Sequence, residues 1–131
     1  MNGKPRFDIR FDKDAGKEYQ KLKQPALEMV NKSIDELEYR ADEVGKPLAN
    51  KRTMKLAGCR EIKLRKAGIR IIYKITDQQV DVLRVIWILS VEKRSDDYVF
   101  KKASHRHQVF RENDTPLEKL KQSKSWKDNK K

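Results

Sequence analysis

The sequence predicts an α+β fold in which two N-terminal helices pack on a mainly antiparallel four-stranded sheet. Between residues 59 and 91, apolar or alternating stretches are separated by short turns, which is typical of strands joined as hairpins. Between residues 12 and 45, apolar residues recur every three or four positions, which is typical of amphipathic helices. A strand before these helices and a helix after the sheet complete the expected order β-α-α-β-β-β-α.

The first strand and first helix follow from a change of period near residue 12. Apolar and charged side chains alternate from residue 7 to residue 11, which predicts a short strand. Asp12 is then expected to cap a helix, because its side chain can accept a hydrogen bond from a free backbone N–H in the first turn. Ala15, Tyr19 and Leu22 follow at helical spacing.

The second helix has the clearest pattern in the chain. Pro25 suits a first helical position, where a missing N–H costs nothing. Gly45 suits the position just after a helix, and Pro47 prevents the helix from resuming. The apolar stripe between them has spacings of three and four and consists of Leu27, Val30, Ile34, Leu37, Ala41 and Val44.

Three strands and a third helix are expected next. The strand expected at Val80–Val91 is the longest and most apolar, which favours a central place in the sheet. The expected elements are strands at Cys59–Lys66, Ile69–Thr76 and Val80–Val91, turns at 67–68 and 77–79, and a helix at Ser95–Arg106.

The periodic pattern fades after residue 106. We therefore expect one folded domain over residues 1–106 and a basic, flexible C-terminal extension over residues 107–131. Trp126 is the exception in this polar extension, and it is a candidate anchor for a partner.

Composition points to a cytoplasmic protein that has no membrane partner. The chain has one cysteine, Cys59, so it cannot form an internal disulfide, and a reducing compartment is expected. The N-terminal residues lack the apolar core of a signal peptide. The longest apolar run, residues 85–89, is far too short to span a bilayer.

The excess positive charge is concentrated in residues 46–74, which we call the basic block. It contains ten Lys or Arg residues and one acid, Glu61, whereas residues 1–45 carry nine basic and ten acidic side chains. Such a block predicts an electrostatic surface for a polyanion. Its loop, residues 46–55, suits an RNA backbone, and the expected RNA contacts are Lys51, Arg52, Lys55, Arg60, Arg65 and Lys66.

Strand alternation gathers part of this charge on one face. Glu61, Lys63 and Arg65 are expected to project together, and Arg70 returns toward them from the next strand. Arg94 and Tyr98 arrive from the end of the long strand and the following helix; with Glu61, Lys63 and Arg70 they form the candidate catalytic set.

This set suits RNA cleavage by attack of the 2′-hydroxyl. That reaction needs a base, cations on the phosphorane-like transition state and an acid or cation at the leaving oxygen, and it requires no metal or other cofactor. A row of cations on a strand is also compatible with a solvated face or with a surface for an acidic partner. A lone glutamate in such a row, here Glu61, is more often a member of a salt bridge than a base.

The run from Lys55 to Tyr73 resembles the RelE branch of the RelE/ParE toxins of bacterial type II toxin–antitoxin modules. The shared features are a Lys-Leu-x-Gly approach, a basic strand, a Gly-x-Arg-hydrophobic-x-Tyr hairpin and an apolar strand that ends in Arg94, followed by Tyr98. The resemblance covers roughly residues 6–106 and implies the RelE fold. Glu61 stands where other members carry a second lysine.

The resemblance implies a ribosome-dependent endonuclease that cleaves mRNA in the A site, with mRNA and ribosomal RNA as partners. Lys63 would be the base or part of the cationic cluster, Arg65 would bind phosphate and Arg70 would stabilise the transition state. Arg94 would assist the leaving group, and Tyr98 would stack on the RNA. A cognate acidic antitoxin is implied as well. The alternatives are a ParE-like gyrase inhibitor and a non-catalytic member that binds only antitoxin or nucleic acid.

Overall fold

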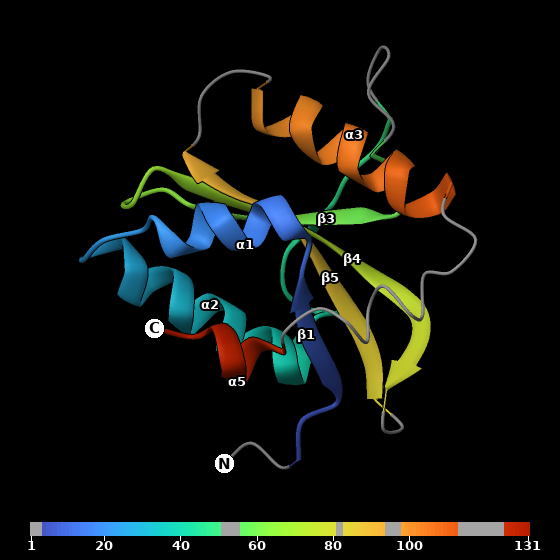
Figure 1. The fold of residues 1–131 in the computed structure, drawn as a ribbon, viewed down its shortest axis with the longest axis horizontal. Coiled ribbons are helices and arrows are strands. Elements are labelled where there is room, and N and C mark those ends of the chain that lie inside the picture. The colour runs from blue at the N-terminus through green and yellow to red at the C-terminus, as the bar shows by residue number, and fades with distance from the viewer. Residues whose placement is uncertain (1–3, 51–55, 81–82, 94–97, 113–124) are drawn as a thin grey trace.

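A computed structural model describes residues 4–50, 56–80, 83–93, 98–112 and 125–131 of this protein. The helices and strands follow one another in the predicted order, with additions after α2 and at the C-terminal end (Figure 1). They are β1 (Phe7–Phe11), α1 (Lys13–Gln20), α2 (Ala26–Arg40), β2 (Lys46–Pro47), β3 (Cys59–Leu64), β4 (Ile69–Val80), β5 (Leu83–Lys93), α3 (Tyr98–Glu112) and α5 (Trp126–Asn129).

The described strands form one mixed sheet in the order β1-β5-β4-β3-β2. β1 runs parallel to β5, and the other neighbouring pairs are antiparallel. The predicted fold class is therefore confirmed. The two-residue strand β2 adds a fifth strand that the sequence did not reveal, because two residues are too few to show a period. β5 lies between β1 and β4, in agreement with its apolar character.

The change of period at residue 12 marks the boundary that the sequence predicted. β1 alternates buried and partly buried residues, and Asp12 caps α1. The Asp12 Oδ2 atom accepts hydrogen bonds from the backbone N–H groups of Asp14 at 3.0 Å and Ala15 at 3.4 Å. These bonds satisfy donors that have no partner within the helix.

The second helix ends earlier than its apolar stripe suggested. α2 stops at Arg40, and the Arg40 carbonyl accepts hydrogen bonds from the backbone N–H groups of Glu43 and Val44. Gly45 then adopts φ +76°, and a Cβ atom there would lie 2.6 Å from the Tyr73 hydroxyl. The chain turns between Arg40 and Gly45 and enters β2 at Lys46.

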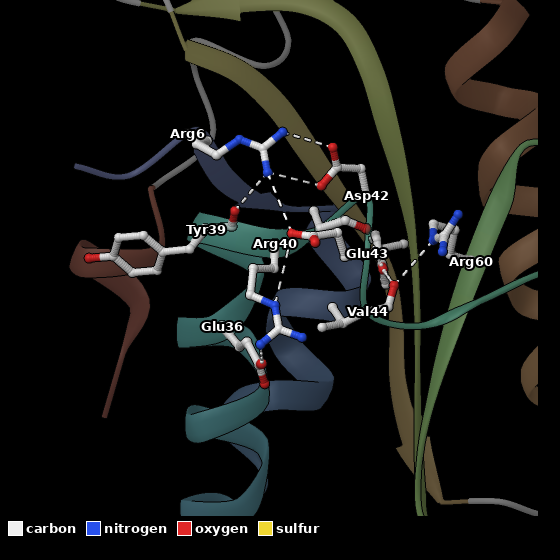
Figure 2. Close-up of polar contacts among 10 residues, drawn as sticks. Arg6, Glu36, Tyr39, Arg40, Asp42, Glu43, Val44 and Arg60 are labelled. Atoms are coloured by element: carbon white, nitrogen blue, oxygen red, sulfur yellow. Dashed lines mark hydrogen bonds and ion pairs between the residues drawn. The ribbon is translucent and has the colours of Figure 1, made fainter. Parts of the chain in front are cut away.

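Polar contacts hold the end of α2 against the start of the chain and against β3 (Figure 2). Arg6 donates to both Asp42 carboxylate oxygens, at 3.1 and 2.7 Å, and to the Tyr39 carbonyl. From the other side, Arg60 of β3 donates to the Val44 carbonyl at 3.2 Å and to the Gly45 carbonyl at 3.0 Å. The turn after α2 is thus fixed from two directions.

The β3–β4 hairpin closes through residues 65–68, so β3 is two residues shorter than predicted. Gly68 takes φ +67° and donates its N–H to the Arg65 carbonyl, which supports the predicted turn at 67–68. The predicted turn at residues 77–79 is wrong, because β4 continues through them to Val80. Strand pairing needs only backbone groups, and an irregularity between Ile75 and Gln79 accommodates this polar stretch.

The main core lies between the sheet and the helices α1 and α2. It joins β1, α1 and α2 to alternate residues of β4 and includes Phe7, Ile9, Phe11, Tyr19, Val30, Ile34, Leu37, Ile71, Tyr73, Ile88 and Trp126. α1 lies between α2 and α3 (Figure 1). No helix in the described part of the chain is long and apolar enough to cross a membrane.

The segment after residue 106 contributes to this architecture. α3 crosses residue 106 and continues to Glu112, and Trp126 in α5 reaches the core with 2% of its surface exposed. The Trp126 ring lies 5.8 Å from Phe11 and 5.3 Å from Tyr19, and its Nε1 donates to Asp35 at 2.8 Å. The expectation of a flexible extension does not describe residues 107–112 and 125–131, because this buried aromatic contact and the helix hold them.

Candidate active site

The β3–β4 hairpin brings three charged residues to one face of the sheet. Lys63 pairs directly with Arg70 across the ladder, and Glu61 lies two residues before Lys63 on β3. Because side chains alternate between the faces of a strand, these three point to the same side. Ile71 and Tyr73 point to the opposite side and belong to the main core.

Glu61 forms ion pairs with both cations. Its Oε1 atom lies 3.7 Å from the Lys63 Nζ atom, and its Oε2 atom lies 3.1 Å from an Arg70 terminal nitrogen. The exposed fraction of the side chain falls from 32% for Lys63 to 12% for Arg70 and 5% for Glu61. The expectation that Glu61 projects from an open face is therefore wrong, because neighbouring groups cover its carboxylate.

Phe100 of α3 contributes to the surroundings of this cluster. Its ring lies under the Arg70 guanidinium, 4.4 Å from ring centroid to Cζ, which is cation–π geometry. α3 is attached to α1 through Arg106, which donates to both Glu18 carboxylate oxygens at 3.1 and 2.8 Å. Phe100 is not in the candidate set that the sequence predicted. Its signal was an aromatic residue in the first turn of the helix that follows the most apolar strand.

The other predicted site residues have different positions. Arg65 and Lys66 lie in the hairpin turn and are exposed, so Arg65 does not share the strand face as predicted. Arg60 directs its guanidinium to the backbone carbonyls after α2. Tyr98 is the first residue of α3, and its side chain is not among those described. Four further predicted residues lie outside the described part of the chain, namely Lys51, Arg52, Lys55 and Arg94.

Cys59 and the histidines do not extend the charged cluster. Cys59 is buried beside Lys74 in the ladder register, and burial raises the pKa of its thiol to about 11. A thiol of that pKa is a poor nucleophile at neutral pH. His107 is buried in α3, whereas His105 is exposed. Within the described residues, no group of three or more His, Cys, Asp or Glu side chains is placed to hold a metal ion.

The arrangement can bind a phosphate group. Lys63 and Arg70 pair across the β3–β4 ladder, and the Lys63 side chain is partly exposed whereas that of Arg70 is largely covered. A guanidinium presents a planar fork of donors that matches two phosphate oxygens. The buried carboxylate and the aromatic ring restrict where that fork can point. Two fixed cations beside each other are suited to stabilising the extra negative charge of a phosphorane-like transition state.

The comparisons with known proteins agree with this geometry. No family model matches the chain. The mRNA interferase toxin RelE of Escherichia coli strain K12 is 33% identical over 100 residues, which are 76% of this chain and 96% of that protein. The structure of an Escherichia coli RelE double mutant in the free state has a TM-score of 0.58 and 31% identity, and the likeness covers 78% of this chain and 97% of that one.

A third similarity is to the RelBE2 toxin–antitoxin complex of Mycobacterium tuberculosis, with a TM-score of 0.51 and 29% identity over 72% of this chain and 97% of that chain. The fold and the charged hairpin thus define a toxin of the RelE/ParE superfamily. Within that superfamily, the chain belongs to the RelE family.

Proposed function

We propose that this protein is the toxin of a type II toxin–antitoxin module and that it acts as an endoribonuclease on mRNA in the ribosomal A site. The observation that carries the proposal is the 33% identity to an mRNA interferase toxin over 96% of that protein's length. The paired cations Lys63 and Arg70, of which Lys63 is partly exposed, support it, because RNA cleavage needs positive charge at the scissile phosphate.

The proposed reaction is transesterification by the ribose 2′-hydroxyl and needs no metal. The 2′-oxygen forms a bond to phosphorus while the bond from phosphorus to the 5′-oxygen breaks. The products are a 2′,3′-cyclic phosphate and a 5′-hydroxyl, and the proton removed from the 2′-oxygen is balanced by one delivered to the 5′-oxygen. Lys63 would act as base or as part of the cationic cluster, Arg70 would stabilise the phosphorane, and Arg94 would assist the leaving 5′-oxygen.

The remaining predicted residues would hold the RNA. Tyr98 would stack on a base, since aromatic rings bind unpaired bases of RNA in this way. Arg65 and Lys66 are exposed in the β3–β4 turn, where they can reach a phosphate backbone. The other proposed backbone contacts are Lys51, Arg52 and Lys55, together with Arg60, whose guanidinium also donates to the Val44 and Gly45 carbonyls.

An acidic antitoxin is the proposed protein partner. The likeness to the toxin of a toxin–antitoxin complex supports this partner. The basic block supports it further, because ten cations and one acid within 29 residues would attract a negatively charged segment. Such a segment would compete with RNA for the same surface.

The test is expression of the protein in cells, followed by primer extension along several mRNAs. The proposal predicts cuts in phase with codons, and these should vanish when translation initiation is blocked. Arg70→Ala should abolish the cuts, whereas Lys32→Ala, on the exposed face of α2, should leave them intact. Intact mRNA together with altered DNA supercoiling would reject the proposal in favour of a gyrase inhibitor.

A further inference from the structure

The buried carboxylate of Glu61 has a role that follows from its two partners. We infer that Glu61 is a positioning residue that holds Arg70 and Lys63 in the orientation needed by the scissile phosphate, and is not itself the base. This inference rests on the proposed ribonuclease function. Its evidence is the geometry of Glu61, Lys63, Arg70 and Phe100, all of which lie in the described part of the chain.

Burial separates Glu61 from the substrate side of the cluster. Glu61 is 5% exposed and Lys63 is 32% exposed, so an approaching phosphodiester meets the lysine first. A general base must come within about 2.6–3.2 Å of the hydroxyl that it deprotonates. Each Glu61 oxygen instead faces a cation, Oε1 toward Lys63 and Oε2 toward Arg70.

The Arg70 guanidinium is held from two directions. Glu61 approaches one of its terminal nitrogens at 3.1 Å, and its Cζ atom lies over the Phe100 ring, 4.4 Å from the ring centroid. A free arginine side chain has many rotamers and loses that freedom when it binds. An arginine that is already fixed avoids this loss and needs no rearrangement when charge develops on the phosphate.

Removing the negative charge of Glu61 should affect RNA binding and catalysis differently. With Glu61 ionised, Lys63, Arg70 and Glu61 carry a net charge of +1, and neutralising Glu61 raises it to +2. The added positive charge should hold RNA at least as tightly, while the loosened guanidinium stabilises the transition state less well. Binding and catalysis should therefore change in opposite directions, which a simple loss of folded protein would not produce.

The experiment uses the full-length protein with ribosomes programmed with a defined mRNA and measures kcat and KM across pH 5–9. Glu61→Gln should lower kcat by about 10- to 100-fold, because a misplacement of about 1 Å can cost that much. KM should stay equal or fall, and the shape of the pH profile should not change. Glu61→Asp keeps the charge and should recover part of the loss. Glu36→Gln, at an exposed ion pair on α2, is the matched control and should resemble the wild type.

A double variant separates positioning from direct catalysis. In an Arg70→Lys background, Glu61→Gln should slow single-turnover cleavage by less than about threefold, because the group that it orients has already been changed. If the two losses multiply, or if the acidic limb of the pH profile disappears in Glu61→Gln, then Glu61 is the base and the inference is wrong. An unchanged kcat in Glu61→Gln would also overturn it.

Failure of a variant to fold and failure of the proposed function give different results. If Glu61→Gln does not fold by circular dichroism, the kcat of Glu61→Asp decides, and a value equal to the wild type or a complete loss overturns the inference. If the wild-type protein cleaves no mRNA on ribosomes, the proposed function fails, and the positioning role fails with it.

Discussion

Replacing Trp126 with alanine is expected to lower the free energy of unfolding by about 3–5 kcal/mol, the usual cost of removing a large buried aromatic ring. Only 2% of this residue is exposed, and its ring contacts Phe11 and Tyr19. A buried tryptophan removes about 150–250 Å² from water, which corresponds to about 4–6 kcal/mol as an upper bound. Alanine retains a small part of that burial.

Two further variants divide this effect. Trp126→Phe keeps an apolar ring but loses the hydrogen bond from Nε1 to Asp35, and it should cost about 1–2 kcal/mol. Asp35 keeps its ion pair with Lys130 at 2.9 Å, so the carboxylate is not left alone. Lys127→Ala, at the exposed neighbour, is the control and should change stability by less than about 0.5 kcal/mol.

The assay is urea unfolding at pH 7, followed by circular dichroism at 222 nm, because the substitution itself changes tryptophan fluorescence. A loss of less than about 1 kcal/mol in Trp126→Ala would refute the reasoning, since it falls well below any cost of emptying a core position. It would mean that residues 125–131 do not rest on the core in solution.

Three other outcomes follow from buried polar groups. Tyr73→Phe should lower the free energy of unfolding in urea by about 1–2 kcal/mol, because the Tyr73 hydroxyl contacts the Ala41 and Val44 carbonyls at 2.8 and 2.7 Å. An unchanged free energy of unfolding would show that water satisfies these carbonyls when the hydroxyl is removed. Native Cys59 should react with iodoacetamide at pH 8 at least about 100-fold more slowly than in urea, since its pKa of about 11 leaves little thiolate, and equal rates would contradict its burial. Burial raises the pKa of the Asp12 carboxyl, so the folded state binds the carboxyl proton more tightly than the unfolded state does. The stability of the wild type relative to Asp12→Asn should therefore fall as the pH rises above the unfolded pKa near 3.8. A constant stability difference in urea titrations from pH 3 to 6 would contradict this.

The sequence was a good guide where local chemistry determines structure. Asp12 caps α1 because a side-chain oxygen at that position satisfies free N–H groups, a rule that involves only neighbouring residues. The β3–β4 hairpin itself could be predicted from strand alternation and the Ala67-Gly68 turn, although the turn spans residues 65–68 and so pairs Arg70 with Lys63. Both features follow from residues that are close together in the chain.

Features that depend on distant segments could not be predicted in the same way. The burial of Glu61 depends on tertiary packing, and alternation alone assigns a face without saying what covers it. Trp126 appeared to stand in a polar tail because its partners, Phe11 and Tyr19, are more than 100 residues away. Polar residues 77–79 resemble a turn, yet β4 continues through them, with a register shift between Ile75 and Gln79.

The parallel pairing of β1 with β5 implies an order of events during folding. Phe7 pairs with Arg84 and Phe11 with Ile88, so β1 has no strand partner until residues 84–88 have been synthesised. The β3–β4 and β4–β5 hairpins join neighbouring segments and close small loops, which form faster than distant contacts. We therefore expect the hairpin that carries Lys63 and Arg70 to acquire amide protection before β1 in pulsed hydrogen exchange, and simultaneous protection would argue against this order. The proposed RNA-binding surface would then be assembled before the domain closes around its first strand.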